Sequence, residues 1–207
     1  MSRNRQLLPI PTLEFEKPLW KAGFTRIAGI DEAGRGAWAG PVVAAVVILP
    51  ADPSLTSTLD KVRDSKLMTP VSRETWSVRI KDCAISWCVG IASSGEIDAL
   101  GIVPATKLAC ERALTGLHAD YLLTDYLVLR EVDLPQTALV KGDQRSLSVA
   151  AASVLAKTSR DALMRELDDQ FPGYNFARHK GYGTRQHAEA LIKLNRCGIH
   201  RVSFSIP

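Results

Sequence analysis

The amino-acid sequence predicts a three-layer α/β domain with an appended helical element at its C-terminal end. With 207 residues and a hydrophobic content of 46%, the chain can bury one substantial core but is short for two full domains. Its first third is rich in strand-forming residues, and strand and helix patterns alternate in the remainder. These observations favour one sheet between two layers of helices.

The first elements are two strands, predicted at residues 27–31 and 42–49. The second run is so uniformly apolar and β-branched that it should be buried on both faces. Pro70 suits the first turn of a helix that continues to about Lys81. Loose alternation over residues 84–91 then predicts a third strand.

A divided helical region follows the third strand. Ser93 and Glu96 form a capping-box pattern at its start. Gly101 and Pro104 should break the region into two helices, of which the second ends near Gly116.

The last elements are two short strands and two helices. Residues 121–125 and 138–140 are strand candidates. From Ser148 the apolar residues follow one stripe of a long helix that ends before Pro172. Thr184 can cap a last helix, which a glycine then ends.

The chain divides into three predicted parts. Residues 1–24 should form a loose N-terminal leader, residues 25–172 the α/β domain, and residues 173–207 a basic helical segment. This last segment has six Lys or Arg against one acid, whereas the net charge of the whole chain is +4. A basic end on a nearly neutral body is typical of a surface that binds a polyanion, although a solvated charged face is the ordinary alternative.

Composition also restricts the compartment and the chemistry. The four cysteines show no CxxC pair and no spacing typical of a zinc site, so they are expected to be small core residues in a reducing compartment. The N-terminal residues lack the apolar core of a signal peptide, and the longest apolar run is too short to span a bilayer. We therefore expect a cytoplasmic protein. No Walker loop or zincin motif is present.

The strongest chemical signal is a pair of acids at the end of the first strand. Asp31 and Glu32 follow an apolar run and precede Gly34 and Gly36. Glycines let backbone N–H groups approach a ligand closely, and adjacent carboxylates are hard ligands for a divalent cation. This pattern suggests a metal beside a cradle for a phosphate or sugar. The alternative for an arbitrary Asp-Glu pair is a solvated turn.

Two further acids follow predicted strands. Asp125 ends one strand, and Asp143 comes directly after another. If the strands lie side by side, all four acids converge at one edge of the sheet. Like charges about 5 Å apart repel by roughly 3 kcal/mol per pair at an effective dielectric near 20, so the cluster requires cations. Oxygen-only ligands favour Mg2+ or Mn2+, a pair of which can assist phosphodiester cleavage. For each acid alone, a turn residue is the alternative.

Five motifs make the sequence recognisable. They are Ile30-Asp-Glu-Ala-Gly-Arg-Gly, Arg63-Asp-Ser-Lys66, the run from Lys141-Gly-Asp through Ala-Lys157 to Arg160-Asp161, His179-Lys-Gly-Tyr-Gly-Thr184, and His200-Arg-Val-Ser-Phe204. In order and spacing they resemble the type 2 ribonuclease H family (ribonuclease HII), from about Arg26 to Phe204. The resemblance implies a ribonuclease H-like catalytic domain with a mixed five-stranded sheet. It also implies that the C-terminal segment completes the substrate site.

The resemblance assigns roles to individual residues. It implies that the catalytic, metal-binding carboxylates are Asp31, Glu32, Asp125 and Asp143. It implies substrate contacts through Gly34, Arg35, Gly36, Lys66, Ser146, Ser148, Lys180 and Tyr182. The glycine loop would contact the ribose 2′-hydroxyl and adjacent phosphates, and Tyr182 would pack against the sugar and base beside the scissile phosphate. The 2′-hydroxyl is what distinguishes RNA from DNA at such a site.

Several residues keep an alternative or depart from the family pattern. Ser146 and Ser148 are also candidates to cap the long helix, and Asp161 is expected to pair with a basic neighbour rather than to bind metal. Family members usually have a second lysine where this chain has Leu67. They commonly have glycine after the third acid, where Tyr126 stands.

The activity that the resemblance implies is metal-dependent cleavage of RNA hybridised to DNA. It includes nicking on the 5′ side of single ribonucleotides in duplex DNA, leaving 3′-hydroxyl and 5′-phosphate ends, in ribonucleotide removal. The expected partner is nucleic acid, and the expected state is a monomer. The alternatives are a hybrid-binding module without turnover and a related metal nuclease with another substrate, such as a junction resolvase.

Overall fold

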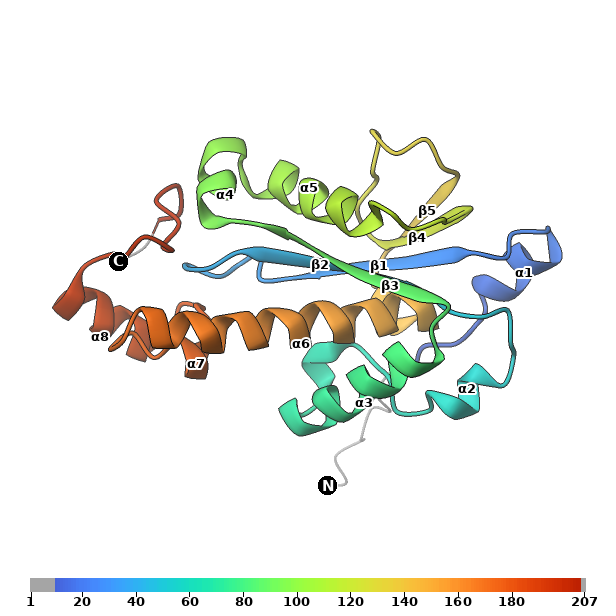
Figure 1. Ribbon diagram of the computed structural model, residues 1–207, viewed down its shortest axis with the longest axis horizontal. Helices are drawn as coiled ribbons and strands as arrows, with labels where there is room; N and C mark the ends of the chain where they lie inside the picture. The colour runs from blue at the N-terminus through green and yellow to red at the C-terminus, as the bar shows by residue number, and fades with distance from the viewer. Residues whose placement is uncertain (1–9, 206–207) are drawn as a thin grey trace, which may run out of the picture.

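The computed structural model describes residues 10–205 (Figure 1). In this part of the chain the strands are β1 (Ile27–Ala33), β2 (Val42–Ile48), β3 (Ser86–Ala92), β4 (Tyr121–Asp125) and β5 (Gln136–Leu139). The helices are α1 (Glu16–Lys21), α2 (Leu55–Thr58), α3 (Pro70–Cys83), α4 (Ser94–Leu100), α5 (Ile102–Leu114), α6 (Leu147–Gln170), α7 (Phe176–His179) and α8 (Arg185–Leu194), with 3-10 turns η1 (Ser65–Leu67) and η2 (Gly142–Gln144).

The strands form one mixed sheet in the order β3-β2-β1-β4-β5. β1 pairs with β2 antiparallel and with β4 parallel, and β4 pairs with β5 parallel. The helices α4 and α5 cover one face, and α6 with α3 covers the other (Figure 1). The predicted three-layer α/β architecture with a mixed five-stranded sheet is confirmed.

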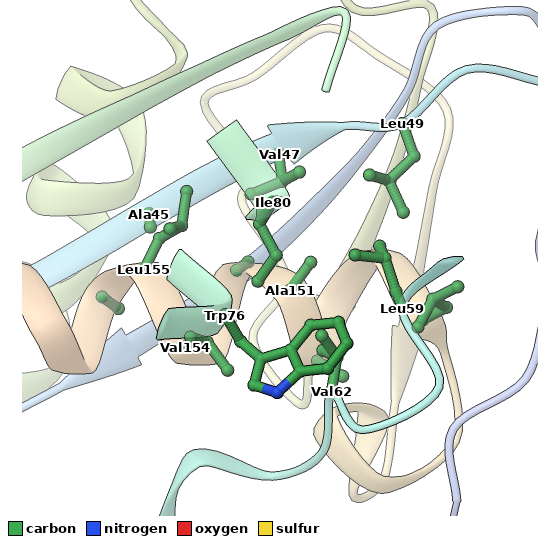
Figure 2. Packing of buried hydrophobic residues seen from close by; sticks show 14 of the residues in the cluster. Ala45, Val47, Leu49, Leu59, Val62, Trp76, Ile80, Ala151, Val154 and Leu155 are labelled. Atoms are coloured by element: carbon green, nitrogen blue, oxygen red, sulfur yellow. The ribbon is translucent and has the colours of Figure 1, made fainter. Parts of the chain in front are cut away.

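The β2 strand is buried along its whole length, as its sequence predicts. Side chains of a strand alternate between faces, so Ala45 and Val47 join the core under α6 while Val46 and Ile48 join the core under α5. Figure 2 shows the first of these cores, where Trp76 of α3 packs among aliphatic side chains. Helices on both faces therefore explain an apolar run without polar alternation.

Glycines allow α6 and α5 to lie directly against the sheet. A Cβ on Gly29 of β1 would stand 2.2 Å from the carbonyl carbon of Ser148 in α6. A Cβ on Gly90 of β3 would stand 2.0 Å from the carbonyl oxygen of Ala109 in α5. No side chain fits at either point, so the backbone of each helix contacts the backbone of the strand directly. These contacts set the distance between each helix and the sheet.

Most predicted boundaries are confirmed within a few residues. Thr69 caps α3, and Ser93 with Glu96 forms the predicted capping box of α4. Thr184 caps α8 through the N–H of His187. The main difference is β5, which begins at Gln136, two residues earlier than predicted. Among the described residues, no helix is long and apolar enough to cross a membrane.

The N-terminal segment is not the loose leader that the sequence suggests, at least from residue 10 onward. Thr12 pairs with the chain beside α6, and Leu13 is 1% exposed. Glu16 of α1 is buried and accepts hydrogen bonds from Ser146 Oγ at 2.6 Å and Ser148 Oγ at 2.7 Å. The prediction for residues 1–9 lies outside the described residues. A contact across 130 positions leaves no local pattern, which is why the sequence did not reveal it.

The C-terminal element packs on the end of α6 through Met164 and Leu167, and a chain of buried histidines holds the element itself together. The N–H of Cys197 donates to His200 Nδ1 at 2.9 Å, so His200 must carry its proton on Nε2. His200 Nε2 then donates to His187 Nε2 at 3.0 Å. His187 carries its own proton on Nδ1, which donates to the carbonyl oxygen of Tyr182 at 3.0 Å. The network requires both rings to be neutral, because a second proton on either ring would remove an acceptor.

This network predicts acid sensitivity of the fold. Burial lowers the pKa of His187 from 6.5 to about 4. The unfolded chain therefore binds more protons than the folded one between these values, and stability is lost as the pH falls. The free energy of unfolding should decrease by about 2 to 3 kcal/mol between pH 7 and pH 4 through this group.

Urea unfolding at a series of pH values measures the effect. His187→Gln keeps a hydrogen-bonding side chain but does not titrate, so its stability should depend less steeply on pH than that of the wild type. Equal slopes for the two proteins over this range would contradict the role of His187.

Candidate active site

Two neighbouring carboxylates stand at the end of the central strand β1. Asp31 is 5% exposed, and its backbone pairs with Ala45 of β2. Burial raises the pKa of Asp31 well above its ordinary value, and the carboxylate of Glu32 raises it further. Burial also raises the pKa of Glu32, although Arg35 donates to Glu32 Oε1 at 3.0 Å and partly offsets this effect. Both acids therefore lack a sufficient positive counterpart.

The neighbouring strand β4 brings a third carboxylate to the same edge. Asp125 is the last residue of β4, which runs parallel to β1, so both strands end on one side of the sheet. The N–H of Gly142 donates to Asp125 Oδ1 at 2.7 Å and holds this carboxylate in place. Asp125 shares a cavity of about 340 Å³ with Asp31 and Glu32.

The fourth predicted acid stands beside this group in the turn η2. Asp143 is 4% exposed. Its pKa is raised to about 6, first by burial and then by the carboxylates of Asp64 and Asp125. Asp143 is not among the residues that line the cavity, but it lies within electrostatic reach of Asp125. The structure thus brings the four predicted acids to one edge of the sheet.

One lysine interacts with this whole cluster. Lys66 lies in η1 and lines the cavity. Burial works against its ammonium charge, yet the pKa of Lys66 is raised, because Asp64, Asp31, Asp143 and Asp125 all stabilise that charge. Arg35 and Lys157 also line the cavity, but Lys157 already pairs with Asp161. These three cations are fewer than the five carboxylates of Asp31, Glu32, Asp64, Asp125 and Asp143, so the cluster keeps an excess of negative charge.

This excess charge fits a divalent cation. Within residues 10–205, no three acidic, histidine or cysteine side chains already form a metal-binding group. The fit rests instead on the type of donor and on the pKa values of Asp31, Glu32 and Asp143, which burial and neighbouring carboxylates raise. Hard oxygen donors select Mg2+ or Mn2+ over softer metals.

The predicted glycine loop forms another wall of the cavity. Gly34 has a φ of +97°, a conformation that strongly favours glycine, and a Cβ here would stand 2.0 Å from Arg160 Nε. A Cβ on Gly36 would meet no protein atom within 4 Å, so the backbone is open on that side. The loop therefore presents bare backbone beside the acids.

The C-terminal element supplies the aromatic wall. Tyr182 lines the cavity. The guanidinium of Arg160 lies 5.3 Å from the centre of its ring, and the ammonium of Lys157 lies 5.6 Å from it. Lys180 lies elsewhere: it lines an adjacent cavity of about 410 Å³ and its ammonium donates to the carbonyl of Ala177. Tyr182 and Lys157 border both cavities, so the two form a continuous surface.

The predicted substrate contacts of Ser146 and Ser148 are wrong. Both side chains are buried, at 0% and 1% exposure. Ser146 caps α6 by accepting from the N–H of Val149, which confirms the capping alternative for this residue. Ser148 is not a cap, because its hydroxyl and N–H both donate to Glu16. Neither serine can reach a ligand in the cavity.

Lys157 is a site residue that the sequence analysis did not select. It lies on α6 at the end of the motif that begins at Lys141, and it lines the cavity of the acids. Asp161, one turn further, accepts from Lys157 Nζ at 2.6 Å and forms an ion pair with Arg73 at 3.5 Å. The expectation that Asp161 pairs with a basic neighbour is therefore confirmed. The i, i+4 spacing of Lys157 and Asp161 on a helix could have revealed this pair.

Comparison with known proteins identifies relatives over most of the chain. The family model described as Ribonuclease HII matches residues 28–206. Ribonuclease HII of Dehalococcoides mccartyi is 50% identical over 92% of this chain and 90% of its own length. Ribonuclease HII of Thermus thermophilus is 48% identical over 92% of this chain and 91% of its own length.

Solved structures agree with the fold. The ribonuclease HII chain in a PCNA complex from Archaeoglobus fulgidus superposes with a TM-score of 0.76 at 25% identity, covering 88% of this chain and 96% of that one. Ribonuclease H2 from Pyrococcus horikoshii gives 0.66 at 25% identity, covering 81% and 86%. A ribonuclease HIII solved with Mn2+ shares the fold at 17% identity and 0.63, covering 83% and 63%.

The structure gives a physical meaning to the departure at Tyr126. This residue has a φ of +64°, in the left-handed region that favours glycine and disfavours bulky side chains. Its ring is 69% exposed, and its N–H donates to the carbonyl of Leu139. The backbone therefore still takes the conformation suited to glycine, and the tyrosine carries the strain.

This strain predicts an unusual order of stabilities at position 126. Tyr126→Gly and Tyr126→Ala both remove the ring, but only alanine keeps the Cβ that is strained at positive φ. Tyr126→Gly should therefore be more stable than Tyr126→Ala by about 1 kcal/mol, the reverse of the ordinary order. Thermal unfolding of the two variants tests this, and a more stable alanine variant would show that the backbone does not hold the left-handed conformation.

Proposed function

This chain belongs to the ribonuclease HII family, and we propose that it nicks duplex DNA on the 5′ side of single embedded ribonucleotides in a metal-dependent reaction. Membership makes it a type 2 ribonuclease H, a hydrolase of the RNA strand in RNA–DNA hybrids. The observation that carries the finer proposal is one cavity bordered by three carboxylates, the glycine loop and Tyr182. Such a cavity combines a charge cluster for phosphodiester hydrolysis with groups that can examine a sugar.

The carboxylates would hold Mg2+ or Mn2+. Asp31, Glu32 and Asp125 would supply oxygen ligands from the cavity wall, with Asp143 beside them. A bound divalent cation supplies a more acidic water and neutralises charge on the leaving 3′-oxygen. Hydrolysis in this arrangement leaves a 3′-hydroxyl and a 5′-phosphate.

The remaining residues position the substrate. Arg35 keeps Glu32 oriented through their 3.0 Å ion pair. Lys66 and Lys157 line the cavity as cations suited to phosphate oxygens. The backbone of the loop at Gly34 and Gly36 would contact the ribose 2′-hydroxyl, and the ring of Tyr182 would pack against the neighbouring sugar and base. Catalysis then depends on position rather than on a covalent intermediate.

The proposal extends to the surroundings of the reaction. The adjacent cavity is lined by five Lys or Arg side chains against two acids, so it offers net positive charge next to the site, which supports a nucleic-acid partner. All four cysteines are free thiols, which supports a cytoplasmic location. We also propose that the protein acts as a monomer in ribonucleotide removal.

A nicking assay tests the proposal directly. On a duplex with one ribonucleotide in a DNA strand, the wild type should cut on the 5′ side of that residue in Mg2+ or Mn2+ and be silent in EDTA. Asp31→Asn should still bind the duplex but lose at least about a hundredfold in rate, because it removes a charged metal ligand.

The controls separate the alternatives. Asp82→Asn removes an exposed acid on α3 and should cut like the wild type. Binding of the duplex without nicking in either metal would indicate a hybrid-binding module. Cleavage of an all-DNA duplex at the same rate would indicate a nuclease of another specificity.

A second prediction concerns Tyr182. Tyr182→Ala should lower the turnover number on the single-ribonucleotide duplex about tenfold to a hundredfold, while the dissociation constant changes by less than about fivefold, because stacking orients the reacting sugar more than it anchors the duplex. Tyr182→Phe keeps the ring and should retain more turnover than the alanine variant. Single-turnover rates and anisotropy titrations measure both quantities, and an unchanged rate in Tyr182→Ala would remove this role.

A further inference from the structure

Two arginines are the largest fully buried side chains in the described part of the chain. Arg160 of α6 and Arg201 near the C-terminal end are each 0% exposed. Within residues 10–205, neither of them forms an ion pair. A buried charge without an ionic partner is costly unless hydrogen bonds satisfy it. The hydrogen-bond acceptors of these two guanidinium groups therefore indicate the role of each arginine.

Arg201 binds the carbonyl groups of the glycine loop. Its Nη2 donates to the carbonyl oxygen of Gly34 and its Nη1 to that of Arg35, both at 2.7 Å. Its Nε and Nη2 also donate to the carbonyl oxygen of Gly40, at 3.0 Å and 2.9 Å. One planar guanidinium thus joins both ends of the segment that follows β1.

Arg160 joins the same segment to the turn that carries Tyr182. Its Nη2 donates to the carbonyl oxygen of Ala39 at 3.1 Å and its Nε to that of Pro41 at 2.9 Å. Its Nη1 donates to the carbonyl oxygen of Lys180 at 2.9 Å. The guanidinium also lies 5.3 Å from the ring of Tyr182. The absence of a side chain at Gly34 leaves the space that Arg160 occupies.

These bonds decide which way the loop peptides face. In a planar trans peptide, the carbonyl of one residue and the N–H of the next point in opposite directions. Because Arg201 draws the carbonyls of Gly34 and Arg35 into the protein, the N–H groups of Arg35 and Gly36 face away from it. Both residues line the cavity of the acids. No hydrogen-bond acceptor within residues 10–205 occupies either N–H.

The two guanidinium groups also bring positive charge beneath this loop. Burial and, to a smaller extent, the nearby charge of Arg160 lower the pKa of Arg201 to about 10. Both groups remain cationic at neutral pH. Positive charge behind outward-facing N–H groups favours an electron-rich oxygen in front of them.

We propose that Arg201 and Arg160 are positioning residues of the active site, which fix the backbone N–H groups of Arg35 and Gly36 toward the ribose and its phosphate. Neither arginine touches the substrate; they act through the loop and through the turn that carries Tyr182. This inference rests on the proposed function, because the ribose is the group that the oriented N–H donors would recognise.

The test is Arg201→Lys, which keeps the charge but loses the planar fork of donors. Its turnover number on the single-ribonucleotide duplex should fall about tenfold to a hundredfold. Its affinity for an all-DNA duplex of the same sequence should change by less than about twofold, because the other phosphate contacts remain. The matched control is Arg112→Lys, an arginine on α5 that also donates to a backbone carbonyl and should behave as the wild type.

Two outcomes of this comparison would overturn the inference. One is equal turnover in Arg201→Lys and Arg112→Lys. The other is a loss of turnover matched by an equal loss of all-DNA affinity and of melting temperature, which would indicate a merely structural role.

A backbone measurement separates this inference from the proposed function and does not depend on turnover. In the wild type, the amide hydrogens of Arg35 and Gly36 should exchange rapidly with solvent and should be protected when the ribonucleotide duplex is added in EDTA. The hydrogen-bonded amides of residues 37–40 should exchange faster in Arg201→Lys than in Arg112→Lys. Slow exchange at Arg35 and Gly36 in the free wild type would overturn the inference even if the Lys variant fails to fold. Failure of the wild type to nick, with these exchange rates as expected, would instead overturn the proposed function alone.

Discussion

Repulsion among carboxylates at one edge of the sheet is the constraint on which the rest of this structure depends. Asp31 at the end of β1 and Asp125 at the end of β4 are held close because the two strands are parallel neighbours. Burial and neighbouring carboxylates together raise the pKa values of Asp31, Glu32 and Asp143, so keeping these groups ionised is costly unless a cation binds them. Gathering buried like charges costs stability, and perturbed carboxylates of this kind are typical of functional sites; the function we propose for them is metal-assisted hydrolysis.

Cations and backbone dipoles surround this charge without neutralising it. Lys66, Arg35 and Lys157 each reach the cavity from a different element, so the site requires the whole fold to assemble. Arg160 and Arg201 remain behind the loop, where they bind only carbonyl oxygens. This division keeps the acids available to a divalent cation and keeps the loop N–H groups available to a sugar.

Buried polar contacts also join segments that are remote in sequence. Glu16 binds the two serines at the start of α6, and the histidines of the C-terminal element connect His200 to the carbonyl of Tyr182 through His187. Each contact satisfies polar atoms that would be costly to bury alone, although Oε2 of Glu16 has no hydrogen-bond partner among the described residues. Glu16 thereby ties the N-terminal end of the described chain to α6, and the hydrogen bond from Arg160 of α6 to the carbonyl oxygen of Lys180 ties the C-terminal element to the same helix.

The sequence by itself determined the elements and the chemical type of the site. Apolar periodicity located the strands and helices, and the residue types of the five motifs indicated carboxylates, a glycine loop and an aromatic contact, because these signals are local along the chain. Only the tertiary structure decided which polar residues face the cavity. It buried Ser146 and Ser148 against Glu16, placed Lys157 in the cavity wall and turned Arg201 inward, because burial and hydrogen-bond partners depend on segments more than a hundred residues apart.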